Sequence, residues 1–447
     1  MSGSETNPAQ RGLIGFWTCT ALVIGNTIGI GIFMMPAVLA PYGFNALIGW
    51  AVTALGCVFL AGVFARLARQ LPDADGPFGY IRSTQGDGPA FLAIWCYWVS
   101  LWITNATLAV GVVAYLQAVA PELMELAPPS VFAFALVWLF VGINLFGVRA
   151  SGPVQILTTV LKLLPMAAVI LLGLWLFVRE PGVYTHHLPT TPVGGPQIMA
   201  ASTIALFAML GLESATIPAG RVKDPGRTIP RATIIGTLLT AVIYVSISTI
   251  PMLLIPQAEL AQSPAPFVVL LDRLLGDGAG RSLALFVVVS GLGALNGWTL
   301  LVGELTRTMA VNGVLPSVFA RDNERGAPAL ALIVTGLLAS AMVAMSYSRS
   351  LVQAFTFLST VVTAANLPLY LLSAVALTIL ALRGQRRVPN DLLILGVLGA
   401  AYSIFAFIGM GQEPFLWALA LAAVGAPIFL AMRLSRAKAR VAPDSAT

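Results

Sequence analysis

Long apolar stretches follow one another along this chain, and short segments rich in polar residues, glycine and proline separate them. A helix that crosses a bilayer needs about 20 mostly apolar residues, and twelve stretches reach or approach that length. They cover residues 13–41, 44–67, 89–120, 129–147, 153–178, 197–219, 232–255, 282–311, 328–347, 352–382, 391–410 and 414–432. Segments such as Pro72–Pro77 and Lys223–Arg227 have the composition of connecting loops. The pattern predicts an all-α integral membrane protein with twelve transmembrane helices.

The composition supports this interpretation. Of the 447 residues, 58% are hydrophobic and 9% are charged, whereas soluble proteins carry about 25% charged residues. A soluble chain of this length could not cover its surface with so few charges. We therefore expect the lipid bilayer to surround many of its side chains.

Few residues are available for the chemistry that enzymes use. The two histidines, His186 and His187, lie next to each other in a polar segment. The cysteines, Cys19, Cys57 and Cys96, lie alone in apolar stretches without the paired spacing of a metal site. The sequence therefore offers almost no residues for a histidine-based metal centre or a Ser-His-Asp triad. We expect no enzymatic activity, no cofactor and no metal.

The positive charges are distributed asymmetrically between the two sides of the predicted bundle. If the N-terminus is cytoplasmic, 19 of the 24 lysines and arginines fall on the cytoplasmic side. Four fall outside, namely Arg179, Arg273, Arg281 and Arg349, and Lys162 lies within a span. Such an excess is typical of cytoplasmic loops, so we expect both termini in the cytoplasm. The net charge of +6 then reflects topology and requires no nucleic-acid partner.

Two of the predicted spans contain helix-breaking residues near their centres. The first span carries Gly29–Gly31 followed by Pro36, and the sixth carries Gly211–Glu213 followed by Pro218. Either motif alone could reflect close helix packing. Together they occupy corresponding positions in two halves of five spans each, and such pairs point to the binding site of a transporter.

Breaks of this kind have a direct physical consequence. They free backbone groups that lipid cannot satisfy, so they must line a cavity. A half-helix that begins near Gly31 would present N–H groups and its positive dipole end to a carboxylate, while carbonyl groups before each break would accept from an ammonium. The sequence thus predicts a site for the zwitterionic head of an amino acid. The residues predicted to bind it through the backbone are Ile28, Gly29, Ile30, Gly31, Ile32, Phe207, Leu210 and Gly211.

Five motifs carry a resemblance to a known family. They are Gly29–Phe33 with Pro36 and Ala37, Leu210–Ala215, Val222–Pro230, Gly293–Thr299, and Asn312–Pro316 with Phe319–Arg321. In these stretches the chain resembles the amino acid–polyamine–organocation (APC) superfamily. It is most similar there to the bacterial basic amino-acid/polyamine antiporters, which include arginine/agmatine and putrescine/ornithine exchangers.

The resemblance covers nearly the whole chain and implies an architecture. Residues 13–178 and 197–382 would form two inverted five-helix repeats with broken helices 1 and 6, and residues 391–432 would add two helices. Residues 1–12 and 433–447 would be cytoplasmic tails. The resemblance further implies alternating access in a bacterial inner (plasma) membrane. Relatives occur as monomers and as dimers, so a homodimer is among the expectations.

The resemblance also implies roles for individual side chains. Trp298 matches an aromatic platform whose face could hold a guanidinium or an ammonium group. Asn105 matches a polar contact to the distal cationic group. Tyr97 matches a residue that gates the occluded site, and Glu213 matches an acid involved in proton sensing or conformational switching. Two apolar residues complete the expected side-chain site: Leu108 and Val361.

Other positions depart from the pattern of the basic exchangers. Ile30 replaces a small hydroxyl residue, so carboxylate binding would rely on backbone N–H groups. Phe207 replaces the tryptophan of the arginine/agmatine exchanger, and Leu369 aligns with a tyrosine. Asn366, in the tenth span, either lines the pathway or bridges two helices.

Lys162 lies in the middle of the fifth span, where a charged residue is costly. It resembles a lysine of proton-coupled relatives whose ammonium lies where sodium-coupled relatives bind sodium. This likeness favours sodium independence, with or without proton coupling. The alternative is a static pin that joins the fifth span to the broken first span.

The expected function is therefore sodium-independent secondary transport by alternating access. The first hypothesis is an antiporter of cationic amino acids or their amines, of the arginine/agmatine kind, and Trp298, Asn105 and Glu213 motivate it. The alternative is a proton-coupled transporter of neutral or broad-range amino acids, which Lys162, Ile30 and Phe207 motivate.

Overall fold

A computed structural model describes residues 15–71, 74, 76–146, 152–211, 224–383 and 390–441. Within these ranges the chain forms helices and no β-strand. The α-helices are α1 (Phe16–Thr27), α2 (Gly31–Leu39), α3 (Phe44–Gln70), α4 (Gly76–Gln85), α5 (Asp87–Val119), α6 (Leu123–Leu126), α7 (Pro129–Leu145), α8 (Gly152–Arg179), α9 (Gly195–Ala208), α10 (Pro225–Leu254), α11 (Gln257–Gln262), α12 (Pro266–Leu275), α13 (Ala279–Val311), α14 (Ala329–Met345), α15 (Leu351–Arg383), α16 (Asn390–Gly409) and α17 (Gln412–Val441). Short 3-10 helices lie at Ala40–Tyr42, Pro181–Thr185 and Ser317–Ala320.

Eight of the described helices are long and apolar enough to cross a membrane, so the chain is a multi-pass membrane protein. They lie within α3, α5, α8, α10, α13, α15, α16 and α17. Four shorter apolar segments, Gly31–Tyr42, Pro129–Leu145, Gly195–Ala208 and Ala329–Met345, accompany them. These segments overlap the predicted apolar stretches, while the count of twelve spans and the inverted repeat stay predictions.

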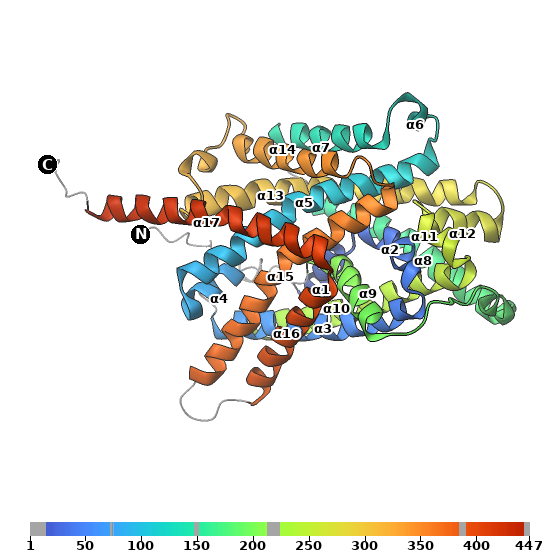
Figure 1. Cartoon of the computed structure of the whole chain (residues 1–447), viewed down its shortest axis with the longest axis horizontal. Helices are drawn as coiled ribbons and strands as arrows, with labels where there is room; N and C mark the ends of the chain where they lie inside the picture. The colour runs from blue at the N-terminus through green and yellow to red at the C-terminus, as the bar shows by residue number, and fades with distance from the viewer. Residues whose placement is uncertain are drawn as a thin grey trace.

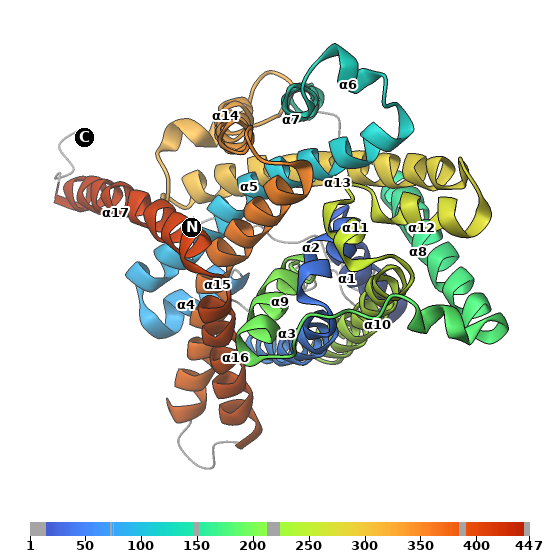
Figure 2. The same cartoon turned by 45° about the vertical axis from the view of Figure 1, so that its right-hand side comes forward.

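The helices pack in two groups that lie side by side. Helices α1, α2, α3, α9 and α10 form one group, which we call the bundle, and Figure 2 shows it below α5 and α13. Helices α5, α7, α13 and α14 form the other group, which we call the scaffold (Figures 1 and 2). Helix α15 packs against α5 of the scaffold and against α9 and α3 of the bundle. Helix α15 therefore connects the two groups.

The outer helices present apolar side chains to their surroundings. On α8, Leu171 and Trp175 are more than half exposed, and on α17, Leu416 and Leu419 are as well. In helix α5, by contrast, 94% of the most apolar 18-residue stretch is buried inside the protein. Hydrocarbon is the environment that suits such exposed apolar faces, and α5 forms the centre of the fold.

Candidate functional site

The first apolar stretch is broken where the sequence predicts it. Helix α1 ends at Thr27, the backbone of Ile28 is extended with φ −75° and ψ 106°, and α2 begins at Gly31. The N–H of Phe33 bonds to the carbonyl of Ile30, at 3.0 Å. The N–H groups of Gly31 and Ile32 make no hydrogen bond to described backbone. These two N–H groups are therefore available to a ligand at the positive end of the α2 dipole.

Two buried tyrosines hold the chain on either side of the break. The hydroxyl of Tyr244, on α10, donates to the carbonyl of Thr27 at 3.0 Å. The hydroxyl of Tyr115, on α5, donates to the carbonyl of Phe33 at 2.8 Å. Both tyrosines are fully buried. Each hydrogen bond compensates for a polar group that would be costly to leave unpaired in this environment.

The second break lies at the end of α9. This helix ends at Ala208, and Met209 leaves the helical conformation with φ −94° and ψ 0°. The N–H of Leu210 bonds to the carbonyl of Phe207 at 3.2 Å, and Gly211 has φ 101°, a value that only glycine adopts readily. The helix cannot continue through this turn. Glu213 and the rest of the second motif lie outside the described residues.

Close packing at glycine brings the two breaks together. A Cβ atom on Gly31 would lie 2.7 Å from Cε1 of Phe207, so the ring of Phe207 rests directly on the start of α2. The side chain of Ile30 points the other way. It fills a notch between the scaffold helices, where Cβ atoms on Gly111 and Gly291 would lie 3.1 Å and 2.6 Å from it. Ile30 can therefore contribute to a ligand site through its backbone and not through its side chain.

A small cavity of about 40 Å³ lies at the two breaks. It is lined by Thr27, Gly29, Gly31, Ile32, Ser100, Leu101, Thr104, Leu108, Phe207, Ala208, Leu210, Trp298 and Asn366. The volume suffices for about three water molecules, and an amino acid with a long side chain would have to push the helices apart. No aspartate or glutamate is among the described residues of the lining.

The structure brings many of the predicted residues together at this cavity. Seven of them line it: Gly29, Gly31, Ile32, Leu108, Phe207, Leu210 and Trp298. Asn105 and Val361 are buried and are not among the lining residues, and the side-chain oxygen of Asn105 has no hydrogen-bond partner among the described residues. Tyr97 is half-buried on α5, and Lys162 is buried on α8; neither lines the cavity.

The sequence interpretation missed several polar residues of the lining. Thr27, Ser100 and Thr104 were not predicted to bind a ligand, and Asn366, whose role was left open, lines the cavity. Ser100 and Thr104 are four residues apart on α5, so they share one face of that helix. This spacing, next to Asn105, was a signal in the sequence.

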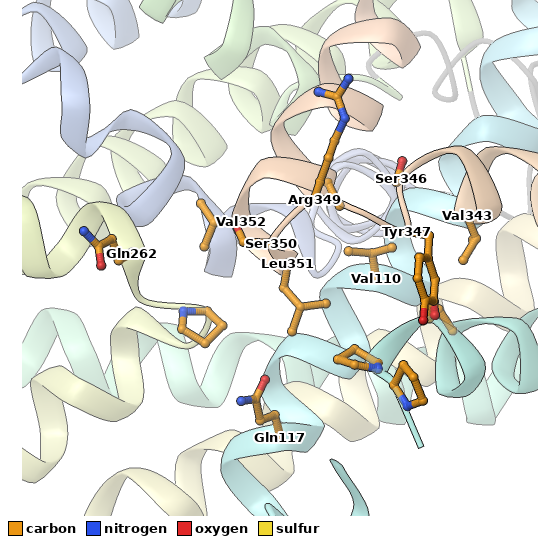
Figure 3. Close-up of a pocket in the computed structure, with 16 residues that line it drawn as sticks. Val110, Gln117, Gln262, Val343, Ser346, Tyr347, Arg349, Ser350, Leu351 and Val352 are labelled. Atoms are coloured by element: carbon orange, nitrogen blue, oxygen red, sulfur yellow. The ribbon is translucent and has the colours of Figure 1, made fainter. Parts of the chain in front are cut away.

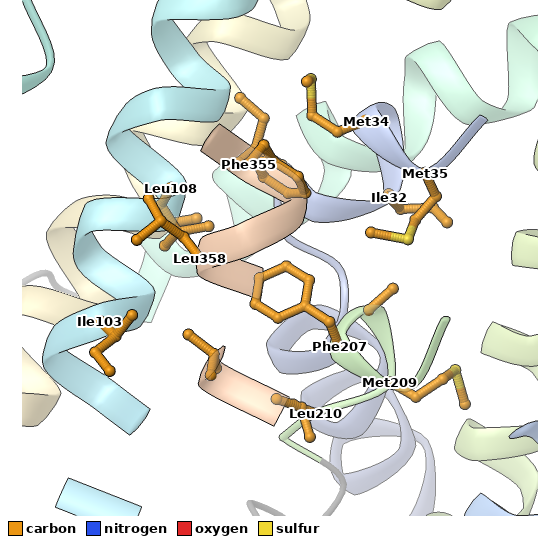
Figure 4. Close-up of a cluster of buried hydrophobic side chains, with 14 of the residues drawn as sticks. Ile32, Met34, Met35, Ile103, Leu108, Phe207, Met209, Leu210, Phe355 and Leu358 are labelled. Atoms are coloured by element: carbon orange, nitrogen blue, oxygen red, sulfur yellow. The ribbon is translucent and has the colours of Figure 1, made fainter. Parts of the chain in front are cut away.

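Two aromatic rings close one end of the cavity. Phe207 of α9 and Phe355 of α15 meet edge to face with ring centres 5.7 Å apart, and Figure 4 shows Leu108 and Ile32 beside them. A larger pocket of about 550 Å³ is lined by other residues of α5 and α15, among them Val110 and Ala354.

The larger pocket lies between the end of α5, the start of α7 and the connection from α14 to α15 (Figure 3). Its polar residues include Gln117, Gln262 and Arg349. Arg349 is paired with Glu413 at 2.6 Å, and its guanidinium stacks over the ring of Phe357 at 4.2 Å.

A multi-pass helical membrane protein whose cavity is built from two interrupted helices is a membrane transport protein. This chain belongs to the amino acid permease family, since the model of that family matches residues 14–431. The match includes both breaks and every described residue of the cavity.

Characterised relatives are similar over most of their length. A putative arginine/ornithine antiporter of Bacillus subtilis is 31% identical over 431 residues, which covers 88% of this chain and 91% of that protein. The putrescine transporter PotE of Haemophilus influenzae is 29% identical and covers 93% and 96%. A cadaverine/lysine antiporter of Escherichia coli is 31% identical over 332 residues, which covers 74% of each chain.

Solved structures show the same fold at lower sequence identity. A manganese transporter of Eremococcus coleocola, in complex with an aromatic bis-isothiourea substituted compound, is 12% identical with a TM-score of 0.56. The two chains correspond over 97% of this protein and 99% of that one. A mutant of the same transporter gives a TM-score of 0.52.

Proposed function

We propose that this chain is a sodium-independent antiporter of cationic amino acids and the amines derived from them. The observation that carries the proposal is the cavity at the two helix breaks. It combines unpaired backbone N–H groups at Gly31 and Ile32 with the aromatic side chain of Trp298. Relatives described as arginine/ornithine and cadaverine/lysine antiporters support the same substrate class.

The parts of the substrate would bind to different walls. Its carboxylate would accept from the N–H groups of Gly31 and Ile32, and its α-ammonium would donate to carbonyls near Ile28 and the end of α9. Trp298 would hold the distal cation by a cation–π interaction, which contributes about 2 kcal/mol or more where water is excluded. An amine without a carboxylate would keep the last of these contacts.

Transport would follow alternating access between two inverted repeats, residues 13–178 and 197–382, with both termini in the cytoplasm. In this orientation the larger pocket would be the external vestibule, and the Phe207–Phe355 contact would separate the site from it. Tyr97, Glu213 and Lys162 would take part in gating or in proton-linked switching.

A second function has a specific observation in its favour. Lys162 is buried, with 5% of its surface exposed, in a span where a charged group is costly. A lysine that gained and lost a proton there would couple transport to the proton gradient. The apolar wall of Leu101 and Leu108 would then accept neutral side chains, and the chain would be a proton-coupled transporter of broad range.

Transport by the purified protein in liposomes distinguishes the two functions. Radiolabelled arginine uptake is measured with agmatine, ornithine, putrescine, alanine or no substrate trapped inside, each with and without an inward proton gradient. Uptake that requires an internal cationic substrate and ignores the gradient supports the antiporter. Alanine uptake into empty vesicles that depends on the gradient, without arginine uptake, overturns it in favour of the second function.

A further inference from the structure

Four buried polar side chains gather on the wall of the cavity and come from three helices. Thr27 ends α1, Ser100 and Thr104 lie on α5, and Asn366 lies on α15. None of the four is more than 8% exposed. We call these four residues the acceptor cluster, because each can accept a hydrogen bond through its side-chain oxygen; the amide nitrogen of Asn366 also keeps a second N–H.

Each of the three hydroxyl groups already donates its proton in a hydrogen bond to a backbone carbonyl. The hydroxyl of Thr27 donates to the carbonyl of Val23 at 2.9 Å, and that of Thr104 donates to the carbonyl of Ser100 at 2.8 Å. The hydroxyl of Ser100 donates to the carbonyl of Tyr97 at 2.7 Å. A hydroxyl has a single proton, so each of the three oxygens can only accept a further hydrogen bond.

The hydrogen bond that Ser100 donates also fixes the orientation of the Asn366 side-chain amide. Its side-chain nitrogen lies 3.4 Å from the oxygen of Ser100, and only the nitrogen can donate there because the proton of Ser100 is already used. The opposite orientation would place two acceptors against each other. The side-chain oxygen of Asn366 is thereby left as a buried acceptor with no partner among the described residues. Such an atom costs free energy unless a ligand or water donates to it.

A wall made mainly of acceptors selects a group rich in N–H donors. An ammonium offers three donors and a guanidinium offers five, and neither has a lone pair that would oppose those of the cluster. An apolar side chain gains nothing at this wall, and a carboxylate would face the lone pairs of the three hydroxyl oxygens and of the side-chain oxygen of Asn366. The cluster also does this without a carboxylate of its own, so it attracts a cation without forming the strong ion pair that would slow release.

We propose that the acceptor cluster binds the distal ammonium or guanidinium of the substrate, with the side-chain oxygen of Asn366 as the specificity-determining acceptor. The inference rests on the proposed function and assigns the part of the site that separates cationic from neutral substrates. Trp298 lines the same cavity and would cover the cation from its aromatic face. Amino acids and their decarboxylated amines share this distal group, so one cluster serves both partners of an exchange.

The test compares the binding of ornithine with that of norvaline, its analogue without the distal amine. Asn366→Leu removes the acceptor at nearly constant volume, and Thr363→Val is the matched control. Thr363 is buried on the same helix, donates to the carbonyl of Ser359, and does not line the cavity. Dissociation constants are measured on purified protein, with thermal unfolding as a check on folding.

We expect Asn366→Leu to weaken ornithine binding by about 10- to 100-fold, the loss typical of a hydrogen bond to a charged group, and to leave norvaline binding within about twofold. Thr363→Val should change neither. An equal loss for both ligands, or none for ornithine, overturns the inference. If the wild-type protein binds norvaline and not ornithine, the proposed function fails instead.

If the leucine variant does not fold, Asn366→Asp tests the same inference. It retains the acceptor and adds a negative charge, so ornithine should bind at least as tightly as to the wild-type protein while its exchange slows. Loss of ornithine binding in this variant would show that the nitrogen of Asn366, and not its oxygen, serves the substrate.

Discussion

Replacement of Gly31 by alanine tests whether the two helix breaks depend on direct contact. The new Cβ atom would lie 2.7 Å from Cε1 and 3.3 Å from Cδ1 of the Phe207 ring. Carbon atoms in contact are normally about 3.5–4.0 Å apart, so the ring or the start of α2 must move by about 1 Å. Overpacking of this kind costs about 1–3 kcal/mol, which corresponds to a factor of about 5–150 in an equilibrium constant.

Because the displaced segment carries the free N–H groups of Gly31 and Ile32, the cost should appear in substrate affinity as well as in thermal stability. Arginine binding and thermal unfolding would be measured for Gly31→Ala, Phe207→Ala and the double variant. Removing the ring makes room for the new methyl group, so the double variant should lose less than the sum of the two single losses. Gly142→Ala is the control, because its Cβ atom would meet nothing within 4 Å. Strict additivity in the double variant would refute the proposed contact.

Three further substitutions address the other parts of the site. Trp298→Ala should weaken arginine and agmatine binding by about 1 kcal/mol or more while Trp298→Phe retains part of it; equal affinities in all three proteins would remove the platform role. Tyr244→Phe leaves the carbonyl of Thr27 unpaired and should lower the free energy of unfolding by about 1–3 kcal/mol, seen as a lower melting temperature; an unchanged melt would mean that water replaces the hydroxyl. Lys162→Ala should abolish proton-driven uptake if the second function holds, and exchange at the wild-type rate in this variant would assign Lys162 no part in the transport cycle.

The apolar pattern predicted most of the architecture because a bilayer leaves the chain few alternatives. A stretch such as 89–120 can cross lipid only as a helix, and α5 covers Asp87–Val119. The break at Gly29–Gly31 was predictable from its pairing with the second motif, since a single glycine in mid-span can also serve close helix packing. Hydropathy does not report the direction of each face, however, and here the interpretation was incomplete.

Helix α5 shows why the sequence did not reveal which helix face lines the cavity. It is buried almost all round, so its apolar residues do not mark one side as the inside. The sequence alone could not separate the lining residues Ser100, Thr104 and Leu108 from Asn105, which is buried and does not line the cavity. Ile30 was likewise compared with a ligand-binding hydroxyl, although its side chain fits the glycine notch of the scaffold.

The two tyrosine hydrogen bonds attach the broken helix to different parts of the molecule. Tyr244 ties the end of α1 to α10 in the bundle, and Tyr115 ties Phe33 of α2 to α5 in the scaffold. If the bundle rocks against the scaffold during transport, these two attachment points must change their separation. The interrupted backbone at Ile28–Ile30 would then be the hinge that takes up the motion. The segment proposed to bind the substrate would thus also change conformation as the protein turns from one side of the membrane to the other.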